Sequence, residues 1–85
     1  MRVIKFKLTP GWNTIPVEMH CEPLWIEYQH GDFVVWCKEY TVLPAEGPLQ
    51  LFLAMTGEPL EDNMTYVGTA TTPDRTFVVH LFNKR

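Results

Sequence analysis

Five side chains of this sequence belong to residue types that bind metals or act as nucleophiles and bases. They are His20, Cys21, His30, Cys37 and His80. A zinc site needs three or four such ligands, usually with two of them closely spaced on one turn. The only close pair here is His20 with Cys21, and adjacent residues of a strand point to opposite faces. The spacing therefore favours no metal site, and we expect no cofactor.

Catalytic arrangements have equally little support in the sequence. The chain contains no serine, which excludes every serine nucleophile. A dyad of Cys37 with His80 would need a partly exposed thiol, yet both residues lie within apolar runs. The paired carboxylates Glu61 and Asp62 lie in a polar, turn-rich segment, which is a poor setting for raised pKa values. We therefore expect no enzyme, with His80 as a hydrogen-bonded strand residue and the two cysteines as reduced core residues.

Short strands must position all of these side chains. Strand-forming segments recur along the whole chain, at 2–8, 12–17, 24–29, 33–39, 49–56, 66–69 and 76–82. Seven prolines and five glycines leave no helix-length window with a 3.6-residue periodicity. The sequence predicts one all-β domain over residues 1–85, a small antiparallel sandwich or partly open barrel of six to seven short strands with essentially no helix.

Turn and proline positions refine this prediction. Pro16 cannot donate a ladder hydrogen bond, so the strand at 12–17 should lie at a sheet edge or be irregular. The segments 43–48 and 57–64 are rich in proline, glycine and charge and should be loops. The last strand, 76–82, is apolar on both faces, so we expect it to be covered on both sides.

A hairpin centred near Gly31 should bring two tryptophans together. In such a hairpin, residues whose numbers add up to 61 or 62 face each other, which places Trp25 opposite Trp36. Their face also carries Glu27 and Lys38 and is too polar for a deep core. The opposite face should be the buried one, and it consists of Leu24, Ile26, Tyr28, Phe33, Val35 and Cys37. We predict that the two tryptophans and their charged neighbours form an interface, unless another sheet or a homodimer partner covers them.

The charges are unevenly distributed along the chain. The net charge is −3, and Lys38 is the only base between Leu8 and Asp74. If the first and last strands lie close together, the terminal bases form one basic edge on an otherwise acidic protein. The candidate clamps for an anionic ligand are Arg2, Lys5, Lys7 and Arg75. Nucleic acid is a disfavoured partner, because phosphates would be repelled over most of the chain.

Membrane and secretion signals are absent from the sequence. No apolar run exceeds five residues, far short of the roughly 20 that a membrane span needs. The opening residues 1–7 also lack the apolar core of a signal peptide. We therefore expect a cytoplasmic protein without a membrane partner.

Several segments follow one another in an order that can be compared with known families. They are the basic opening strand 3–8, the Ile15-Pro16 pair, the strand 24–29 turning at Gly31, the strand with Trp36, the Thr56-Gly57 turn, the Tyr-Val-Gly-Thr run at 66–69 and the closing Val-His-Leu-Phe at 79–82. This order resembles a family of short, uncharacterised proteins encoded by tailed bacteriophages and prophages. The sequence departs from that family at 19–23, where the family has a smaller turn, so we expect a loop specific to this chain there.

The resemblance implies a cellular context and no catalytic residue, because the family has no assigned activity. It implies an early or accessory phage product in the cytoplasm of an infected bacterium. We expect this product to bind a host or phage protein and modulate it, for example in counter-defence. The alternatives are an oligomeric sponge for a nucleotide-like signal and a minor virion component.

Overall fold

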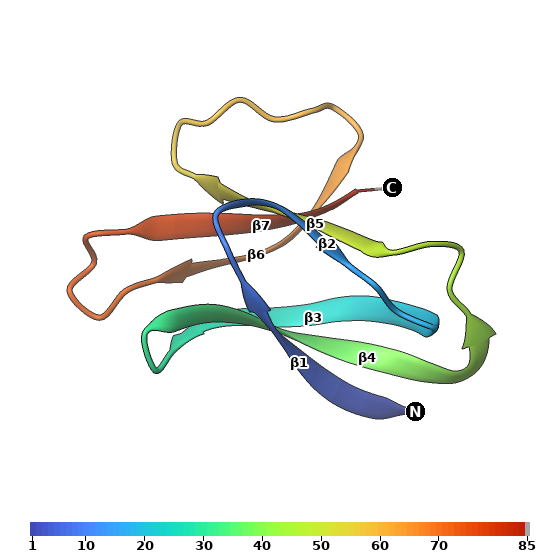
Figure 1. Ribbon diagram of the computed structural model, residues 1–85. Helices are drawn as coiled ribbons and strands as arrows, with labels where there is room; N and C mark the ends of the chain where they lie inside the picture. Colours follow the sequence, from blue (N-terminus) through green and yellow to red (C-terminus); the bar gives the residue numbers. More distant parts are fainter. Residues whose placement is uncertain (85) are drawn as a thin grey trace.

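Seven antiparallel strands form two stacked sheets in the computed structural model, which describes residues 1–84 (Figure 1). The strands are β1 (Arg2–Leu8), β2 (Gly11–Ile15), β3 (Met19–Gln29), β4 (Asp32–Pro44), β5 (Leu49–Met55), β6 (Met64–Thr71) and β7 (Val78–Lys84). The first sheet has the order β1-β4-β3, and the second sheet has the order β2-β5-β7-β6. The prediction of a small all-β sandwich is confirmed, and the sheets do not close into a barrel. Within residues 1–84 there is no helix that could cross a membrane.

The β3–β4 hairpin has the predicted register. Trp25 pairs with Trp36 and Ile26 pairs with Val35, so facing residues add up to 61. The turn residues His30 and Gly31 both have positive φ angles, 51° and 89°. Positive φ at both positions is typical of the tight hairpin turns whose twist matches that of the flanking strands. This turn therefore fixes which residues of β3 and β4 share a face.

The hairpin differs from the prediction at its far end. Residues 19–23 belong to β3 and are not a loop, and β4 continues through residues 43 and 44, so the loop covers only 45–48. A bulge between Pro23 and Trp25 shifts the register. Leu24 is therefore 45% exposed, and its predicted place on the buried face is wrong. The physical reason is that Pro23 has no N–H for the ladder, and a bulged residue interrupts the alternation of faces.

The second sheet contains the predicted edge strand and the predicted C-terminal hairpin. β2 is an edge strand that ends at Ile15, before Pro16. β7 lies between β5 and β6, with Val79 and Leu81 buried against the first sheet. Its other face carries Val78, which is exposed, and His80 and Phe82, which are half-buried. The prediction that β7 is covered on both sides is thus wrong for residues 1–84, because neighbouring side chains shield its outer face only in part.

The core lies between the two sheets. Its buried members are Leu8, Cys21, Ile26, Val35, Cys37, Leu49, Leu51, Leu53, Val79 and Leu81. Both cysteines are free thiols in this layer. Burial, followed by the nearby Cys21, raises the pKa of the fully buried Cys37 from 9.0 to about 12, so this thiol stays protonated at neutral pH.

A glycine lies where β6 packs closely against β3. Gly68 follows a bulge in β6 and faces Ile26 of β3. A Cβ atom at Gly68 would lie 3.0 Å from Cγ2 of Ile26, which is shorter than ordinary van der Waals contact. The position therefore favours a residue without a side chain.

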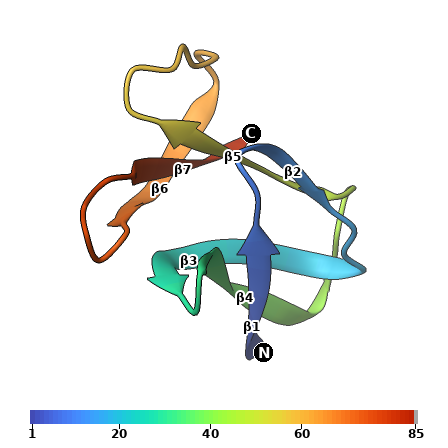
Figure 2. The same ribbon diagram turned by 60° about the vertical axis from the view of Figure 1, so that its left-hand side comes forward.

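The first and last strands do not lie together. β1 is an edge strand of the first sheet, whereas β7 is central in the second sheet, and Figure 2 shows them in different layers. The condition for a single basic edge is therefore not met. Arg2, Lys5 and Lys7 lie on β1, while Arg75 lies in the turn between β6 and β7.

Candidate functional site

The four predicted interface residues share the side of the first sheet that points away from the second sheet. We call this side the first outer face. It carries Val3, Lys5 and Lys7 of β1, Val34, Trp36, Lys38 and Tyr40 of β4, and Glu22, Trp25, Glu27 and Gln29 of β3. Trp25 is 64% exposed, although tryptophan is among the side chains that gain most from burial. The structure thus exposes a large apolar group on a surface that also carries three lysines and two glutamates.

The ring of Trp36 is held by its neighbours. Lys5 Nζ lies 5.1 Å from the centroid of this ring, within cation–π distance. Trp36 Nε1 donates a hydrogen bond to Glu27 Oε1 at 3.3 Å. Lys5 Nζ also donates to Gln29 Oε1 at 2.8 Å, which ties β1 to β3 across β4. Trp36 is therefore a fixed support, and Trp25 is the accessible aromatic group beside it.

The remaining charges of the first outer face are paired within the face. Lys7 Nζ lies 3.4 Å from Asp32 Oδ1, and Lys38 Nζ lies 3.8 Å from Glu22 Oε2. The hydroxyl of Tyr40 donates to the same oxygen of Glu22 at 2.7 Å. Because its lysines already have polar or acidic partners, this face does not offer the unpaired cations that bind phosphates.

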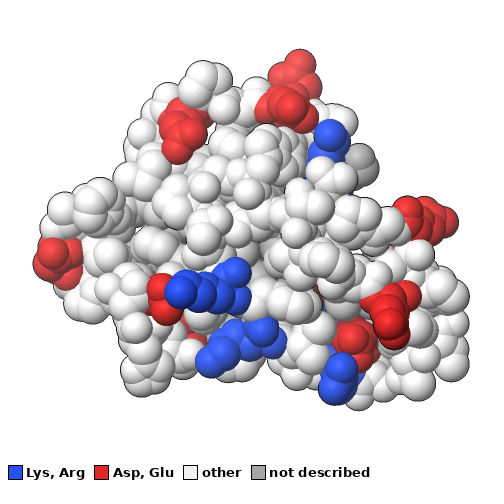
Figure 3. All heavy atoms as spheres, viewed as in Figure 1, with Lys and Arg blue, Asp and Glu red and all other residues white. Residues whose placement is uncertain are grey.

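The four predicted anion clamps do not form a cluster. Arg2 Nε lies 2.6 Å from Glu39 Oε1, and this contact raises the pKa of the guanidinium. Lys7 is five residues further along the same strand, about 17 Å away at the usual rise per residue. Arg75 lies on the second sheet, in a turn where its φ is 61°. In Figure 3 blue atoms lie in the lower half of the visible face and, well apart from these, near its upper edge, so the basic side chains do not form a single patch.

A second aromatic feature was missed by the sequence analysis. Trp12, Phe52, Phe82 and Tyr66 form a row across the outer side of the second sheet, with one ring from each strand. Ring centroids are 5.1 Å apart for Trp12 and Phe52 and 5.7 Å apart for Tyr66 and Phe82. Trp12 is 41% exposed and Tyr66 is 56% exposed. We call this set the aromatic row and its side of the sheet the second outer face.

A chain of hydrogen bonds lies beside the aromatic row. His80 Nε2 is 2.9 Å from Thr56 Oγ1, and His80 Nδ1 is 3.0 Å from Thr69 Oγ1. The hydroxyl of Tyr66 is 2.6 Å from the same Thr69 oxygen. A hydroxyl, an imidazole and a third group resemble the outline of an activated nucleophile. Here, however, the third group is another hydroxyl, and Thr56 begins the β5–β6 connection that rises over this side of the sheet (Figure 1). The chain thus pairs polar atoms of the second outer face with one another.

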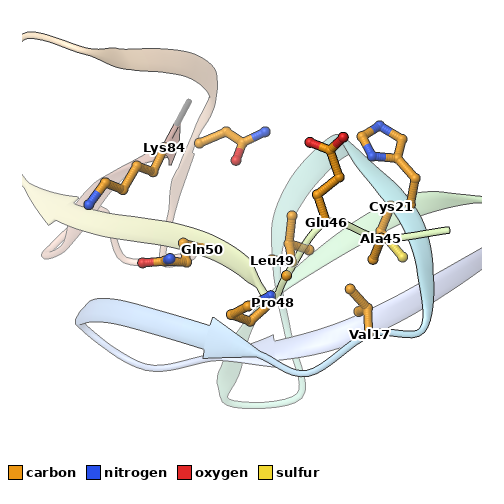
Figure 4. A pocket seen from close by; sticks show the side chains of 11 residues that line it. Val17, Cys21, Ala45, Glu46, Pro48, Leu49, Gln50 and Lys84 are labelled. Atoms are coloured by element: carbon orange, nitrogen blue, oxygen red, sulfur yellow. The ribbon is translucent and has the colours of Figure 1, made fainter.

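One shallow cleft lies at the end of the sandwich, where the 45–48 loop leaves β4 (Figure 4). Its volume is about 400 Å³, and Val17 and Leu49 contribute apolar walls. Glu46 lies on one side, whereas Lys84 extends away from it on the other. The polar groups of the cleft therefore do not converge on one ligand position. No group of three or more potential ligands among residues 1–84 could hold a metal ion.

Comparison with known proteins gives a family and no function. No curated protein and no solved structure matches the chain. The model of one family, described as a domain of unknown function (DUF7352), matches residues 1–85. Because this match covers the whole sequence, the chain belongs to the DUF7352 family of domains of unknown function.

Proposed function

We propose that this protein is a binding module that holds a protein partner on its first outer face, with Trp25 as the central contact. The observation that carries the proposal is the exposed Trp25 paired across strands with the fixed Trp36. Tryptophan is enriched among the few residues that dominate binding free energy in protein interfaces. A rigid aromatic support beside it lowers the entropy lost on binding.

The charges around Trp25 indicate the chemistry of the partner. Lys5 and Lys7 lie along β1 on one side, and Glu22 and Glu27 lie along β3 on the other side. Lys7 and Glu22 already have partners of opposite charge, whereas Lys5 and Glu27 contact the neutral side chains of Gln29 and Trp36. A complementary surface would therefore present an apolar pocket to Trp25, a carboxylate towards Lys5 and a cation towards Glu27. Such a two-sided pattern fits a folded protein surface better than a uniformly charged nucleic acid.

The biological setting of the proposal rests on the segment order described above. The resemblance to short phage and prophage proteins supports a host or phage protein as the partner, in the cytoplasm of an infected bacterium. Binding would then modulate this partner, with counter-defence as one form of modulation. The sponge alternative receives no added support, because the four proposed clamp residues are dispersed.

The test compares two tryptophans that lie on opposite outer faces. Wild-type protein, Trp25→Ala and the matched control Trp12→Ala are immobilised and exposed at low salt to lysates of phage-infected bacteria. We expect one protein to be retained by the wild type and by Trp12→Ala but lost with Trp25→Ala. With that partner purified, Trp25→Ala should raise the dissociation constant of the complex about 30-fold, as for a typical hot-spot residue. If no retained protein distinguishes Trp25→Ala from the wild type, the proposal is wrong.

A further inference from the structure

A groove of about 550 Å³ lies between the β3–β4 turn and the β6–β7 connection, residues 72–77. Figures 1 and 2 both show these two segments at the same end of the sandwich. Three aromatic residues, a proline and an acidic residue line much of the groove, and they are Tyr28, Phe33, Phe77, Pro73 and Asp74. We infer that this groove binds an arginine side chain presented by an exposed segment of another protein.

The aromatic part of the groove comes from inward-facing positions that lie beyond the core. Tyr28 and Phe33 are partners across the β3–β4 hairpin, on the same face as the buried Ile26 and Val35. Their ring centroids are 5.2 Å apart, with an angle of 68° between the ring planes. Both residues are only half-buried, and Phe77, which precedes β7, is 50% exposed. The turn end of the hairpin therefore leaves aromatic surface open to a ligand.

The carboxylate of Asp74 is held in place by its own turn. Its Oδ1 accepts hydrogen bonds from the Thr72 hydroxyl at 2.7 Å and from the Thr76 amide at 3.0 Å. These hydrogen bonds, with that of Thr72 as the largest cause, lower the pKa of Asp74, so the group is ionised at neutral pH. The ion pairs among residues 1–84 are Arg2–Glu39, Lys7–Asp32 and Lys38–Glu22, so neither Asp74 nor the adjacent Arg75 takes part in one. The negative charge at the groove is thus available to a cation from outside the described chain.

Aromatic rings beside an available carboxylate favour an organic cation over other ligands. Ring faces attract cations, whereas an anion would be repelled by Asp74. A neutral apolar ligand would remove water from the carboxylate without giving it a new partner. Among cationic side chains, the planar guanidinium of arginine stacks on aromatic rings and donates directed hydrogen bonds to a carboxylate. Within residues 1–84, Oδ2 of Asp74 accepts no hydrogen bond, so it is the expected acceptor.

The exposure of the groove indicates what kind of molecule carries the cation. Pro73, Asp74 and Phe77 are all exposed residues of the β6–β7 connection. Sites for free small molecules usually enclose most of the ligand surface, which this groove does not. A side chain that enters from a larger protein surface needs no such enclosure. None of the lining residues belongs to the first outer face, so the inference does not rest on the proposed function.

An NMR titration of the nitrogen-15-labelled full chain with a capped glycine-arginine-glycine peptide tests the inference. The amide signals of Gly31, Asp74 and Phe77 should shift and saturate with a dissociation constant on the order of 1–10 mM, as for one cation–π contact and one charged hydrogen bond. The same peptide with citrulline in place of arginine has nearly the same shape without the charge. It should bind at least about tenfold more weakly, because it loses the attraction to both the rings and the carboxylate.

Two variants separate the contributions of the carboxylate and the ring. Asp74→Asn keeps the oxygen that accepts from Thr72 and Thr76, so the turn should persist while arginine binding weakens about tenfold. Phe77→Leu keeps an apolar side chain and should weaken binding about threefold, because it removes only the ring. Glu61→Gln is the matched control, since it changes the net charge equally at an exposed residue outside the groove, and it should have no effect.

Several outcomes would overturn the inference. They are equal affinity for the arginine and citrulline peptides, arginine binding that Asp74→Asn leaves unchanged, and no shift at the groove amides up to about 50 mM peptide. Tetramethylammonium that binds more tightly than the arginine peptide would also overturn it, by assigning the groove to a small free cation. Trp25→Ala should leave the titration unchanged. Arginine binding that persists when no partner is found for Trp25 would contradict only the proposed function.

Discussion

The two outer faces occupy equivalent positions in the sandwich and differ in chemistry. On the first outer face, tryptophans lie among charged side chains that are paired within the face, as in the Lys7–Asp32 contact. On the second outer face, four rings cross the sheet, and the carboxylates on this side belong to the β5–β6 connection, residues 56–63, rather than to the strands (Figure 1). Both sheets present the same kind of apolar inner side to the shared core.

This difference shows that the outward residues of an alternating strand specify what a sheet can bind, while the inward residues specify the fold. The first outer face has charge on two sides of an aromatic centre, which suits recognition of an unlike partner. On the second outer face the strands carry aromatic and small polar side chains, and the acidic β5–β6 connection, residues 56–63, rises over this side of the sheet (Figure 1).

The largest expected effect is the difference in unfolding free energy between substitutions of an inward and an outward residue of β3. Ile26→Ala should reduce the free energy of unfolding by about 2–5 kcal/mol, because Ile26 is buried between the sheets. Trp25→Ala, its neighbour on β3, should cost less than about 1 kcal/mol, because most of this side chain is already in water. Urea unfolding followed by circular dichroism measures both values. A cost for Trp25→Ala equal to that of Ile26→Ala would make the first outer face part of a core.

The loss of stability at alkaline pH tests how well the core between the two sheets excludes water from the Cys37 thiol. The pKa of Cys37 is raised to about 12 in the folded protein, against 9.0 for an ordinary thiol. Above pH 9 the unfolded chain loses this proton and the folded chain keeps it. Folding stability is therefore complete below pH 9 and falls between pH 9 and 12, by up to about 1.4 kcal/mol per pH unit.

Urea unfolding of wild type and Cys37→Ala between pH 8 and 10.5 isolates this contribution. The lysines and tyrosines titrate in both proteins, so only the difference in slope reports on Cys37. Equal slopes would mean that water reaches the thiol in the folded state.

The smallest expected effect is the response of the first outer face to salt. The Lys7–Asp32 pair is solvent-exposed, so Lys7→Ala should change the free energy of unfolding by less than about 1 kcal/mol, and by less at high ionic strength. Urea unfolding at 50 and 500 mM NaCl measures this change. An effect of Lys7→Ala that is equally large at both salt concentrations would show that the lysine does not act through this ion pair.

Local sequence signals were sufficient for the strands and for the tryptophan pair. Alternation identified the strand segments, and the short turn at His30 and Gly31 fixed the register that sets Trp25 opposite Trp36. These features depend on residues close together in the chain. The error at Leu24 arose because alternation was continued through Pro23, where the ladder is interrupted.

The aromatic row could not be found in the same way. Its four rings come from four strands, and their contact depends on the order β2-β5-β7-β6. No local pattern encodes this order, because the pairing of β2 with β5 joins residues that are almost 40 positions apart. The hydroxyl partners of His80 on β6 and after β5 were missed for the same reason.

The order of the strands also has a consequence for how the chain is made. Within the described residues, β2 pairs only with β5. The last residue of β5, Met55, follows the last residue of β2, Ile15, by 40 positions. A ribosome adding about 5–20 residues per second needs roughly 2–8 s for this stretch. During that time β2 has an unpaired backbone and an uncovered Trp12. Pro10 and Pro16 lie on either side of β2, and neither can donate a backbone hydrogen bond. The two prolines thus limit the waiting strand to five residues that could pair with another nascent chain.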